Sequence, residues 1–425
     1  MKEHARPITR AFVIHPEIAG AERAREPALA LEEAVALARA LPDLEVAGAM
    51  AVRLRKPDAG KLFGKGKREE LHAAIAEAEA ELVLVDGPLS PVQQRNLEKL
   101  WEVKILDRTG LILEIFSDRA ATREGVLQVE MAALSYQRTR LVRAWTHLER
   151  QRGGLGFVGG PGETQIEADR RAIDEQLVRL RRQLDKVART RTLHRAARAK
   201  VPFPIVALVG YTNAGKSTLF NRLTGADVLA KDMLFATLDP TMRRVALPGG
   251  GPEVILSDTV GFISDLPTEL VAAFRATLEE VLAADLIVHV RDISHPETQA
   301  QAEDVAAILE SLGVGEAVPR LEVWNKIDRL DEGAHDTVLT QAARSEGVLA
   351  LSAVTGEGIA ALVAAIAEVL AQVTRLSKVH LGFGEGRKRA WLFDKDLVEE
   401  ERQGEDGFDL TVRWSARDEA RFRAL

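Results

Sequence analysis

The chain contains no cysteine among its 425 residues. This absence excludes thiol catalysis, disulfide bonds and metal sites with thiolate ligands. The nine histidines show no ligand-like spacing, so we interpret them as structural residues. No apolar run approaches the roughly 20 residues that a membrane-spanning helix needs. Residues 1–6 are not followed by the apolar core of a secretion signal, and we therefore expect a cytoplasmic protein without stable membrane insertion.

The length and the charge distribution indicate several domains and one basic segment. A chain of 425 residues is too long for one hydrophobic core, so about three domains are expected, and 46% hydrophobic residues allow a sizeable core. The net charge is −7, yet residues 131–200 hold 16 lysines and arginines against 7 acidic residues. Such a local excess predicts a polyanionic partner that binds this segment rather than the whole surface.

The first part of the chain alternates short apolar runs with helical patterns. The predicted strands are 11–15, 46–52, 82–86 and 103–107, and the predicted helices include 28–41 and 67–82. This alternation favours a small parallel or mixed sheet covered by helices. The segment Gly-Lys-Gly-Lys at 64–67 opens the second helix, either as a phosphate-holding element or as a plain turn with solvated lysines.

Two long amphipathic helices are predicted between residues 120 and 200. Their apolar residues recur at spacings of three and four: Leu127, Met131, Leu134, Leu141, Trp145 and Leu148, then Ile166, Ile173, Leu177, Leu180, Leu184 and Val187. Residues 152–162, which lie between them, are too rich in glycine for a helix. We therefore expect an antiparallel helical hairpin with a glycine-rich tip. The apolar Leu155, Phe157 and Val158 distinguish this tip from a plain polar linker.

The second helix of this hairpin carries many more arginines than lysines. The arginines are Arg170, Arg171, Arg179, Arg181, Arg182, Arg189, Arg191, Arg195 and Arg198. Guanidinium groups match phosphates and stack on bases, so RNA is the expected partner. The alternative is a solvated coiled-coil surface.

A phosphate-binding loop follows a short apolar strand at 205–209. The loop has the pattern Gly-x-x-x-x-Gly-Lys-Ser between Gly210 and Ser217, and a helical pattern follows it. The backbone N–H groups of such a loop, with the helix N-terminus, form a nest for phosphate oxygens. Lys216 can reach the β- and γ-phosphates, and the Ser217 hydroxyl can ligate an octahedral Mg²⁺.

Two downstream segments fit the switch regions of a GTPase. In Phe-Ala-Thr-Leu-Asp-Pro-Thr, residues 235–241, Thr237 is expected to complete the Mg²⁺ shell and to sense the γ-phosphate, with Thr241 as its competitor. In residues 254–261, a strand ends at Asp258, which can hold the metal through water. The N–H of Gly261 can then bond the γ-phosphate.

Two further segments fit the recognition of guanine. Residues 321–328 form a strand that ends in Asn-Lys-Ile-Asp, and the Asp328 carboxylate can accept hydrogen bonds from guanine N1 and N2. Adenine offers neither donor, so a polar site of this kind discriminates by ~10⁴ or more. After the run 348–351, Ser352 and Ala353 present a backbone N–H to guanine O6. Ligand sites in α/β sheets lie at the C-terminal ends of strands, where these segments occur.

The predicted site can be stated by role. The catalytic residues are Lys216, Thr237 and Gly261, and the metal ligands are Ser217, Thr237 and Asp258. The GTP-binding residues are Gly210, Tyr211, Thr212, Asn213, Ala214, Gly215, Lys216, Ser217, Thr218, Phe235, Ala236, Thr237, Leu238, Asp239, Asp258, Thr259, Val260, Gly261, Asn325, Lys326, Ile327, Asp328, Ser352 and Ala353.

The chain resembles the HflX GTPases over nearly its whole length. The most diagnostic match is the glycine-rich block 153–165 before the basic helix, and 210–217, 235–241 and 258–262 also match. The resemblance implies a translation-associated GTPase that binds the large ribosomal subunit and its rRNA and helps to split stalled or idle ribosomes. It also implies that the hairpin tip points toward the peptidyl transferase centre.

The expected fold class is α/β. A P-loop GTPase domain at 201–372 follows an N-terminal α/β domain at 1–119 and the basic helical hairpin at 120–200, and a small C-terminal α+β module occupies 373–425. The last module is expected to have strands at 379–383, 390–394 and 408–414. We expect GTP and GDP as ligands, Mg²⁺ as cofactor, no DNA partner and a monomeric chain.

Two positions carry more specific expectations. Asn213 lies where some similar GTPases hold a monovalent cation, so K⁺ beside the phosphates is one interpretation and a plain loop residue is the other. Phe262 follows Asp-Thr-Val-Gly where many GTPases place a glutamine that orients the attacking water. Either a partner supplies the missing group, or Phe262 only packs and another side chain orients the water.

The function has two alternatives to a ribosome-splitting GTPase. One is an RNA chaperone or ribosome-assembly factor that GTP regulates. The other is a GTPase switch with a protein partner, in which the arginines are merely solvated.

Overall fold

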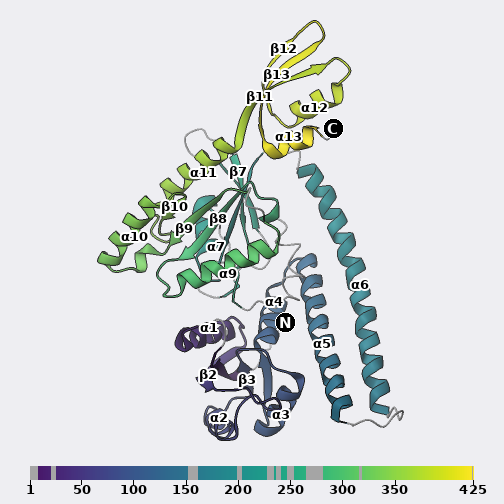
Figure 1. The fold of residues 1–425 in the computed structure, drawn as a ribbon, viewed down its shortest axis with the longest axis vertical. Coiled ribbons are helices and arrows are strands. Elements are labelled where there is room, and N and C mark those ends of the chain that lie inside the picture. The colour runs from purple at the N-terminus through teal and green to yellow at the C-terminus, as the bar shows by residue number, and fades with distance from the viewer. Residues whose placement is uncertain are drawn as a thin grey trace, which may run out of the picture. The chain divides into compact units, whose positions relative to one another are not determined.

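The structure, a computed structural model, describes residues 8–20, 25–151, 161–198, 203–226, 234–235, 241–246, 253–264, 281–314, 318–423 and 425. The chain divides into two compact units, one formed chiefly by residues up to Asp185 and the other chiefly by residues from Lys186 onward. Figure 1 labels their helices and strands. Among the described residues, no helix is long and apolar enough to cross a membrane.

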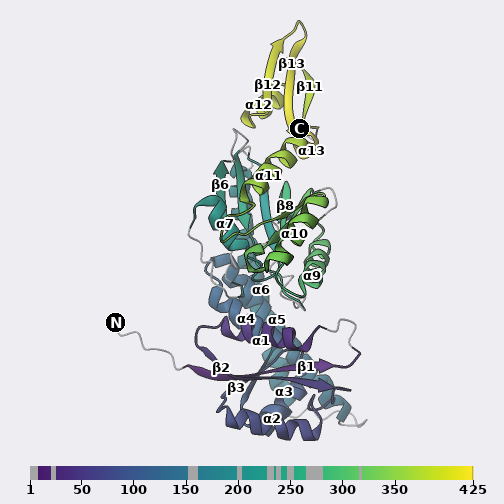
Figure 2. The same cartoon turned by 90° about the vertical axis from the view of Figure 1, so that its left-hand side faces the viewer.

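The first unit contains a four-stranded parallel sheet in the order β2-β1-β3-β4. Its strands are β1 (Thr9–Ile18), β2 (Leu44–Leu54), β3 (Leu82–Val85) and β4 (Lys104–Asp107). The helix α1 (Pro27–Arg39) covers one face, and α2 (Lys65–Glu77) and α3 (Pro91–Trp101) cover the other (Figure 2). The four predicted strands are thus confirmed, with boundaries shifted by a few residues.

Local sequence explains how the helices of this unit begin. Ser90 accepts a hydrogen bond from the backbone of Gln93, whose side chain accepts one from the backbone of Ser90, and proline follows the cap. The segment 64–67 is the start of α2: Gly64 precedes the first turn, and Lys67 forms an ion pair with Glu70 at 2.7 Å. This geometry corresponds to the plain-turn alternative.

The hairpin helices α5 (Arg123–Gln151) and α6 (Pro161–Arg198) run antiparallel. Arg138 pairs with Asp174 at 2.8 Å, and Gln176 donates to Glu130 at 3.3 Å. Most of the predicted tip lies outside the described residues. Its last two residues, Pro161 and Gly162, lie in α6, so the non-helical prediction is wrong for them, because proline is well tolerated in a first helical turn.

A buried carboxylate ties the hairpin to the first sheet. Asp107, at the end of β4, accepts from the backbone of Gly110 in α4 (Arg108–Arg119) at 2.9 Å. It also accepts from the Tyr136 hydroxyl at 2.5 Å and from Arg140 at 3.0 Å, both on α5. Burial, followed by the charge of Asp107, raises the pKa of Tyr136, so the phenol remains a donor to this carboxylate.

The second unit contains a six-stranded sheet in the order β10-β9-β8-β5-β7-β6, in which only β6 is antiparallel. The strands are β5 (Ile205–Gly210), β6 (Thr241–Ala246), β7 (Glu253–Asp258), β8 (Leu286–Asp292), β9 (Arg320–Asn325) and β10 (Val348–Ala350). Because β5 lies between β7 and β8, its C-terminal end is at a point where the strand order reverses, the usual place for a ligand.

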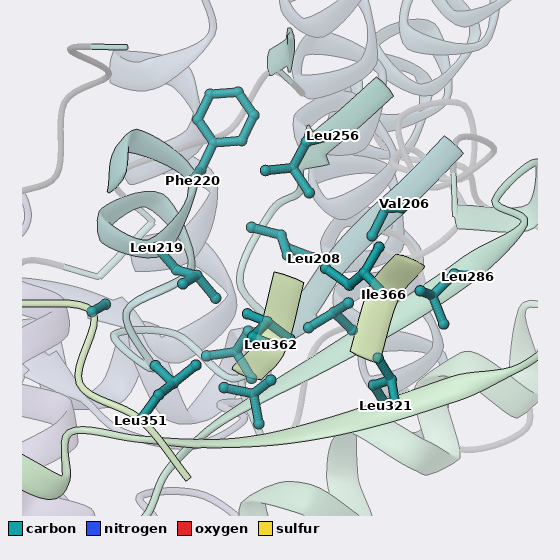
Figure 3. Close-up of a cluster of buried hydrophobic side chains, with 14 of the residues drawn as sticks. Val206, Leu208, Leu219, Phe220, Leu256, Leu286, Leu321, Leu351, Leu362 and Ile366 are labelled. Carbon is teal, nitrogen blue, oxygen red and sulfur yellow. The ribbon is translucent and has the colours of Figure 1, made fainter. Parts of the chain in front are cut away.

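The helices of this sheet are α7 (Lys216–Thr224), α9 (Thr298–Ser311), α10 (Glu332–Arg344) and α11 (Ile359–Val373), with a short 3₁₀ helix at Ile327–Arg329. Figure 3 shows the core cluster that α7 and α11 form with the strands. Its members include Leu208, Leu219, Phe220, Leu362 and Ile366, each at most 2% exposed. This packing fixes α7 against β5, and with it the loop that joins them.

The C-terminal residues of the second unit form a three-stranded antiparallel sheet in the order β11-β13-β12, accompanied by α12 (Gly386–Asp394) and α13 (Ala416–Arg423). The strands are β11 (Thr374–Gly382), β12 (Val398–Gln403) and β13 (Gly407–Ser415). The predicted strand 390–394 is wrong, since these residues lie in α12. The run Trp391-Leu392-Phe393 suits either structure by itself, but good helix formers precede it.

The predicted α/β fold class, with its GTPase-type sheet, hairpin and C-terminal module, is confirmed. The boundaries of the four predicted domains remain predictions.

Candidate nucleotide site

The loop between β5 and α7 depends on two glycines. A Cβ on Gly210 would lie 2.1 Å from the carbonyl oxygen of Val290, and one on Gly215 would lie 2.2 Å from the Asn325 amide. Gly215 also has φ +93°, which other residues adopt only with strain. Between these glycines, Asn213 has a left-handed backbone with φ 58°. The loop therefore lies close to two neighbouring strands, and its sequence is restricted by that proximity.

Lys216 is buried within the loop that it follows. Its ammonium group donates to the carbonyl oxygens of Gly210 at 3.1 Å and Tyr211 at 2.8 Å. Burial lowers the pKa of Lys216 to about 8, although the carboxylate of Asp258 opposes this shift. Phosphate groups near this ammonium would favour its charged form, so the site is suited to an anionic ligand.

Ser217 and Asp258 bring a hydroxyl and a carboxylate together. The Ser217 hydroxyl donates to Asp258 Oδ2 at 2.7 Å, and Asp258 is fully buried at the end of β7. Oxygen ligands of this kind, at adjacent positions, fit the octahedral oxygen shell that Mg²⁺ prefers. The donor set is therefore compatible with the predicted metal.

The residues after β7 contact the phosphate loop through their backbone. Thr212 N–H donates to the Phe262 carbonyl at 2.7 Å, and Phe262 N–H donates to the Gly210 carbonyl at 3.1 Å. A Cβ on Gly261 would lie 2.9 Å from Thr212 Cα and 3.1 Å from the Lys216 ammonium nitrogen. Gly261 is thus in direct contact with the loop, and the Phe262 ring is buried at 2% exposure.

The predicted base-recognition residues meet beside the same loop. Asn325 donates to the Ala214 carbonyl at 2.8 Å and accepts from Ala353 N–H at 3.0 Å. The Ser352 hydroxyl donates to Asp328 Oδ1, which orients that carboxylate. Asn325 therefore connects the phosphate loop to the loop that carries Ala353.

Two side chains of this site were not identified from the sequence. Asp292, at the end of β8, accepts from the Lys326 ammonium at 2.7 Å and so holds the lysine of the base-recognition segment. Arg222 on α7 donates to backbone carbonyls of the loop that begins at Ser352. Both act through tertiary contacts, which neither motif nor spacing reveals, although Asp292 does end a predictable strand.

The remaining predicted residues divide between described and undescribed parts of the chain. Those in the loop and its neighbourhood are Tyr211, Thr212, Ala214 and Thr218, then Thr259 and Val260 after β7, and Ile327 after β9. Ala236, Thr237, Leu238 and Asp239 lie outside the described residues. Phe235 is grouped with the first unit, where its ring makes an edge contact with Phe116 of α4 at 4.6 Å. Thr241, the competitor of Thr237, begins β6 and pairs with Asp258 across the ladder.

Comparison with known proteins covers almost the whole chain. Family models match residues 29–117 (GTP-binding GTPase N-terminal), 119–198 (GTP-binding GTPase Middle Region), 205–326 (50S ribosome-binding GTPase) and 337–423 (HflX C-terminal domain). The GTPase HflX of Magnetococcus marinus is 51% identical over 369 residues, which are 87% of this chain and 84% of that protein. The chain belongs to the HflX family of GTPases. This match confirms the predicted family. It also confirms the predicted enzyme class, a GTPase that hydrolyses GTP.

Two further relatives also match most of the chain. The GTPase HflX of Escherichia coli is 47% identical over 361 residues, 84% of each chain. Putative GTP-binding protein 6 of Xenopus laevis is 36% identical over 403 residues, 92% of this chain and 74% of that protein. The similarity to HflX proteins therefore extends to the N-terminal and middle parts and is not confined to the nucleotide-binding sheet.

Proposed function

We propose that the chain is a monomeric, cytoplasmic GTPase that binds the large ribosomal subunit and promotes the splitting or recycling of stalled or idle ribosomes. The observation that carries this proposal is the presence, in one HflX chain, of an assembled phosphate loop and a long helix with exposed arginines. The description of the model that matches residues 205–326, a 50S ribosome-binding GTPase, supports the choice of partner.

Triphosphate binding is assigned to the loop after β5. Its backbone N–H groups and the start of α7 surround the phosphates, and Lys216 exchanges its bonds to the loop carbonyls for bonds to the β- and γ-phosphates. The N–H of Gly261 and the hydroxyl of Thr237 sense the γ-phosphate. Since Gly261 contacts Thr212, the segment after β7 responds directly to an occupied loop.

The metal is assigned to Ser217, to Thr237 and, through water, to Asp258. A bound Mg²⁺ would offset the charge that develops on the phosphate oxygens. The Ser217–Asp258 contact holds these two groups in place before any ligand binds, so part of the metal site is preorganised.

Guanine recognition is assigned to Asp328 for N1 and N2 and to the N–H of Ala353 for O6. The hydrogen bond from Ser352 fixes the orientation of the Asp328 carboxylate, which would otherwise rotate. Asn325 fixes the position of Ala353 relative to the phosphate loop. Base and phosphate recognition are thus mechanically linked.

Ribosomal RNA binding is assigned to the arginines of α6. Among those whose side chains are described, Arg170, Arg171, Arg179, Arg181 and Arg182 are exposed. Within the described part of the chain, Arg171 and Arg179 pair at 3.9 and 3.5 Å with exposed acidic residues one turn away. Pairs of this kind contribute little, so these guanidinium groups can exchange their partners for phosphates.

A K⁺ ion beside Asn213 is a further part of the proposal. Asn213 has a left-handed backbone and is exposed, so an ion can reach it. A cation there supplies positive charge near the β–γ bridge, as an inserted arginine does in other GTPases. GTP turnover should therefore be faster in K⁺ than in Na⁺ at equal ionic strength, and Asn213→Ala should abolish the difference. Equal rates of the unaltered protein in both salts would exclude the ion.

Co-sedimentation and light scattering test the ribosomal function. The purified chain should sediment with large subunits in a non-hydrolysable GTP analogue and not in GDP, and it should lower the light scattering of whole ribosomes. Lys216→Ala should abolish both effects. Binding to structured RNA but not to subunits would favour an RNA chaperone, and binding to neither would favour a switch with a protein partner; either result would overturn the proposal.

A further inference from the structure

Arg222 lies in the last turn of α7, the helix that begins at the phosphate-binding lysine. Its guanidinium group donates through Nε to the carbonyl oxygen of Ala353 at 2.8 Å and through Nη2 to the carbonyl oxygen of Val354. A planar, always charged fork is well suited to hold two successive carbonyl groups in one orientation. Arg222 thus connects the helix of the phosphate site to the loop after β10.

Hydrogen bonds within this loop close it, and Asp328, Asn325 and Arg222 are among the residues that contact it from outside. Within it, Ser352 N–H donates to the Glu357 carbonyl at 3.0 Å and Gly356 N–H donates to the Ser352 carbonyl at 2.9 Å. Val354 at the turn is 65% exposed, so packing does not hold it. Gly356 has φ +95°, and a Cβ there would lie 3.0 Å from Arg222 Nη1, so the loop passes close to the guanidinium group.

Ala353 is consequently held at both of its backbone groups. Its N–H donates to Asn325, which itself donates to the Ala214 carbonyl of the phosphate loop. Its carbonyl accepts from Arg222. Two separate connections therefore position this residue relative to the phosphate-binding element, one through β9 and one through α7.

We infer that Arg222 is a positioning residue for guanine selectivity, because it holds the carbonyl group of Ala353, the residue whose N–H is assigned to the oxygen at position 6 of the base. This inference rests on the proposed role of Ala353 as the partner of guanine O6. Without Arg222, Ala353 keeps, among the contacts of the described residues, only the bond from its N–H to Asn325, and the base oxygen competes for that same N–H, so the residue loses the contact that would hold it while the base is bound. The loss concerns position 6 alone, because Ser352 still holds Asp328, which recognises positions 1 and 2.

Three diphosphates separate this role from a general effect on folding. GDP carries an oxygen at position 6, 6-thioguanosine diphosphate carries a weakly accepting sulfur there, and inosine diphosphate keeps the oxygen but lacks the 2-amino group. Arg222→Met in the full chain should lower GDP affinity about fivefold to tenfold, the range of one hydrogen bond. It should shrink the preference for GDP over the thio compound and leave the preference for GDP over inosine diphosphate unchanged.

The controls make each outcome decisive. Arg344→Met, an exposed arginine at the end of α10, should change none of the three affinities. Arg222→Lys keeps one donor and should give an intermediate preference at position 6. This variant also tests the inference if the methionine variant does not fold. An unaltered protein that binds GDP and the thio compound equally would refute the role of Ala353. The role of Arg222 would be refuted by a different result. In that case the unaltered protein prefers GDP over the thio compound, but the Arg222 variants lower all three affinities equally or leave them unchanged.

Discussion

The role proposed for Asp328 is to discriminate guanine from other bases. Asp328→Asn replaces an acceptor by an amide donor, so the affinity for GTP should fall at least about 100-fold. The affinity for xanthosine triphosphate should rise, because its C2 carbonyl needs a donor. Ser352 can still hold the amide oxygen, so the fold should survive. Nucleotide titrations measure this change, with the exposed Asp336→Asn on α10 as control. Unaltered GTP affinity in Asp328→Asn would contradict the assignment.

His289 makes the stability of the nucleotide-binding sheet sensitive to acid. Burial, despite the nearby charge of Glu322, lowers the pKa of His289 to about 4, and its Nε2 is buried without a hydrogen-bond partner among the described residues. Below pH 6.5 the unfolded chain therefore binds a proton that the folded chain does not. The free energy of unfolding should fall by up to about 3 kcal/mol between pH 6.5 and pH 4.

Substitution isolates this contribution from that of other titrating groups. His289→Leu should remove about 3 kcal/mol of the loss between pH 6.5 and pH 4, whereas the exposed His72→Leu should leave it unchanged. Denaturant unfolding at a series of pH values measures both. The hypothesis fails if His289→Leu and the unaltered protein have parallel pH profiles.

At the scale of single elements, periodicity and motifs predicted those strands that local sequence alone determines. The strands before Gly210, Asp258 and Asn325 were predictable because each apolar run leads directly into a polar motif. The short run at 391–393 gave a wrong strand, since three apolar residues have no distinguishable period.

Contacts between distant segments could not be predicted in the same way. Asp292 and Arg222 act on residues 34 and 131 positions away, respectively, and a sequence pattern gives no measure of such distances. The packing of Phe235 on Phe116 is of the same kind. The motifs therefore predicted which of the described residues gather around the phosphate loop, but not the side chains that orient them.

The exposed arginines of α6 give an element-scale prediction. If they bind rRNA phosphates, the affinity for large subunits should fall steeply with salt concentration. Each contacting arginine that is removed should lower the log–log slope by about one. Arg181→Ala and Arg182→Ala should therefore reduce the slope, while Arg95→Ala, an exposed arginine of α3, should not. Binding isotherms at a series of salt concentrations measure this slope. An unchanged slope in both α6 variants would place the RNA contact elsewhere.

For the whole molecule, the decisive question is how water is oriented for hydrolysis. The Phe262 ring is buried, and its backbone is bonded to Gly210 and Thr212. A phenyl ring has neither a donor nor an acceptor for water, and the contacts of Phe262 with the phosphate loop are made by its backbone. Among the described residues of this segment, no carboxylate or amide side chain follows Phe262. Of the two explanations given for Phe262, a group supplied by a partner makes the clearer prediction.

Basal GTP turnover should accordingly be slow and should rise at least tenfold when large ribosomal subunits are added, a change of about 1.4 kcal/mol in the barrier. Groups supplied by a partner contribute ~10³ to 10⁵ in other GTPases, so the effect is physically attainable. Turnover measured in K⁺ buffer, with and without subunits, tests this. Lys216→Ala should show no stimulation, because it no longer binds triphosphate tightly. Identical rates with and without subunits would mean that the chain itself orients the water, and the proposed role of a partner in catalysis would have to be abandoned.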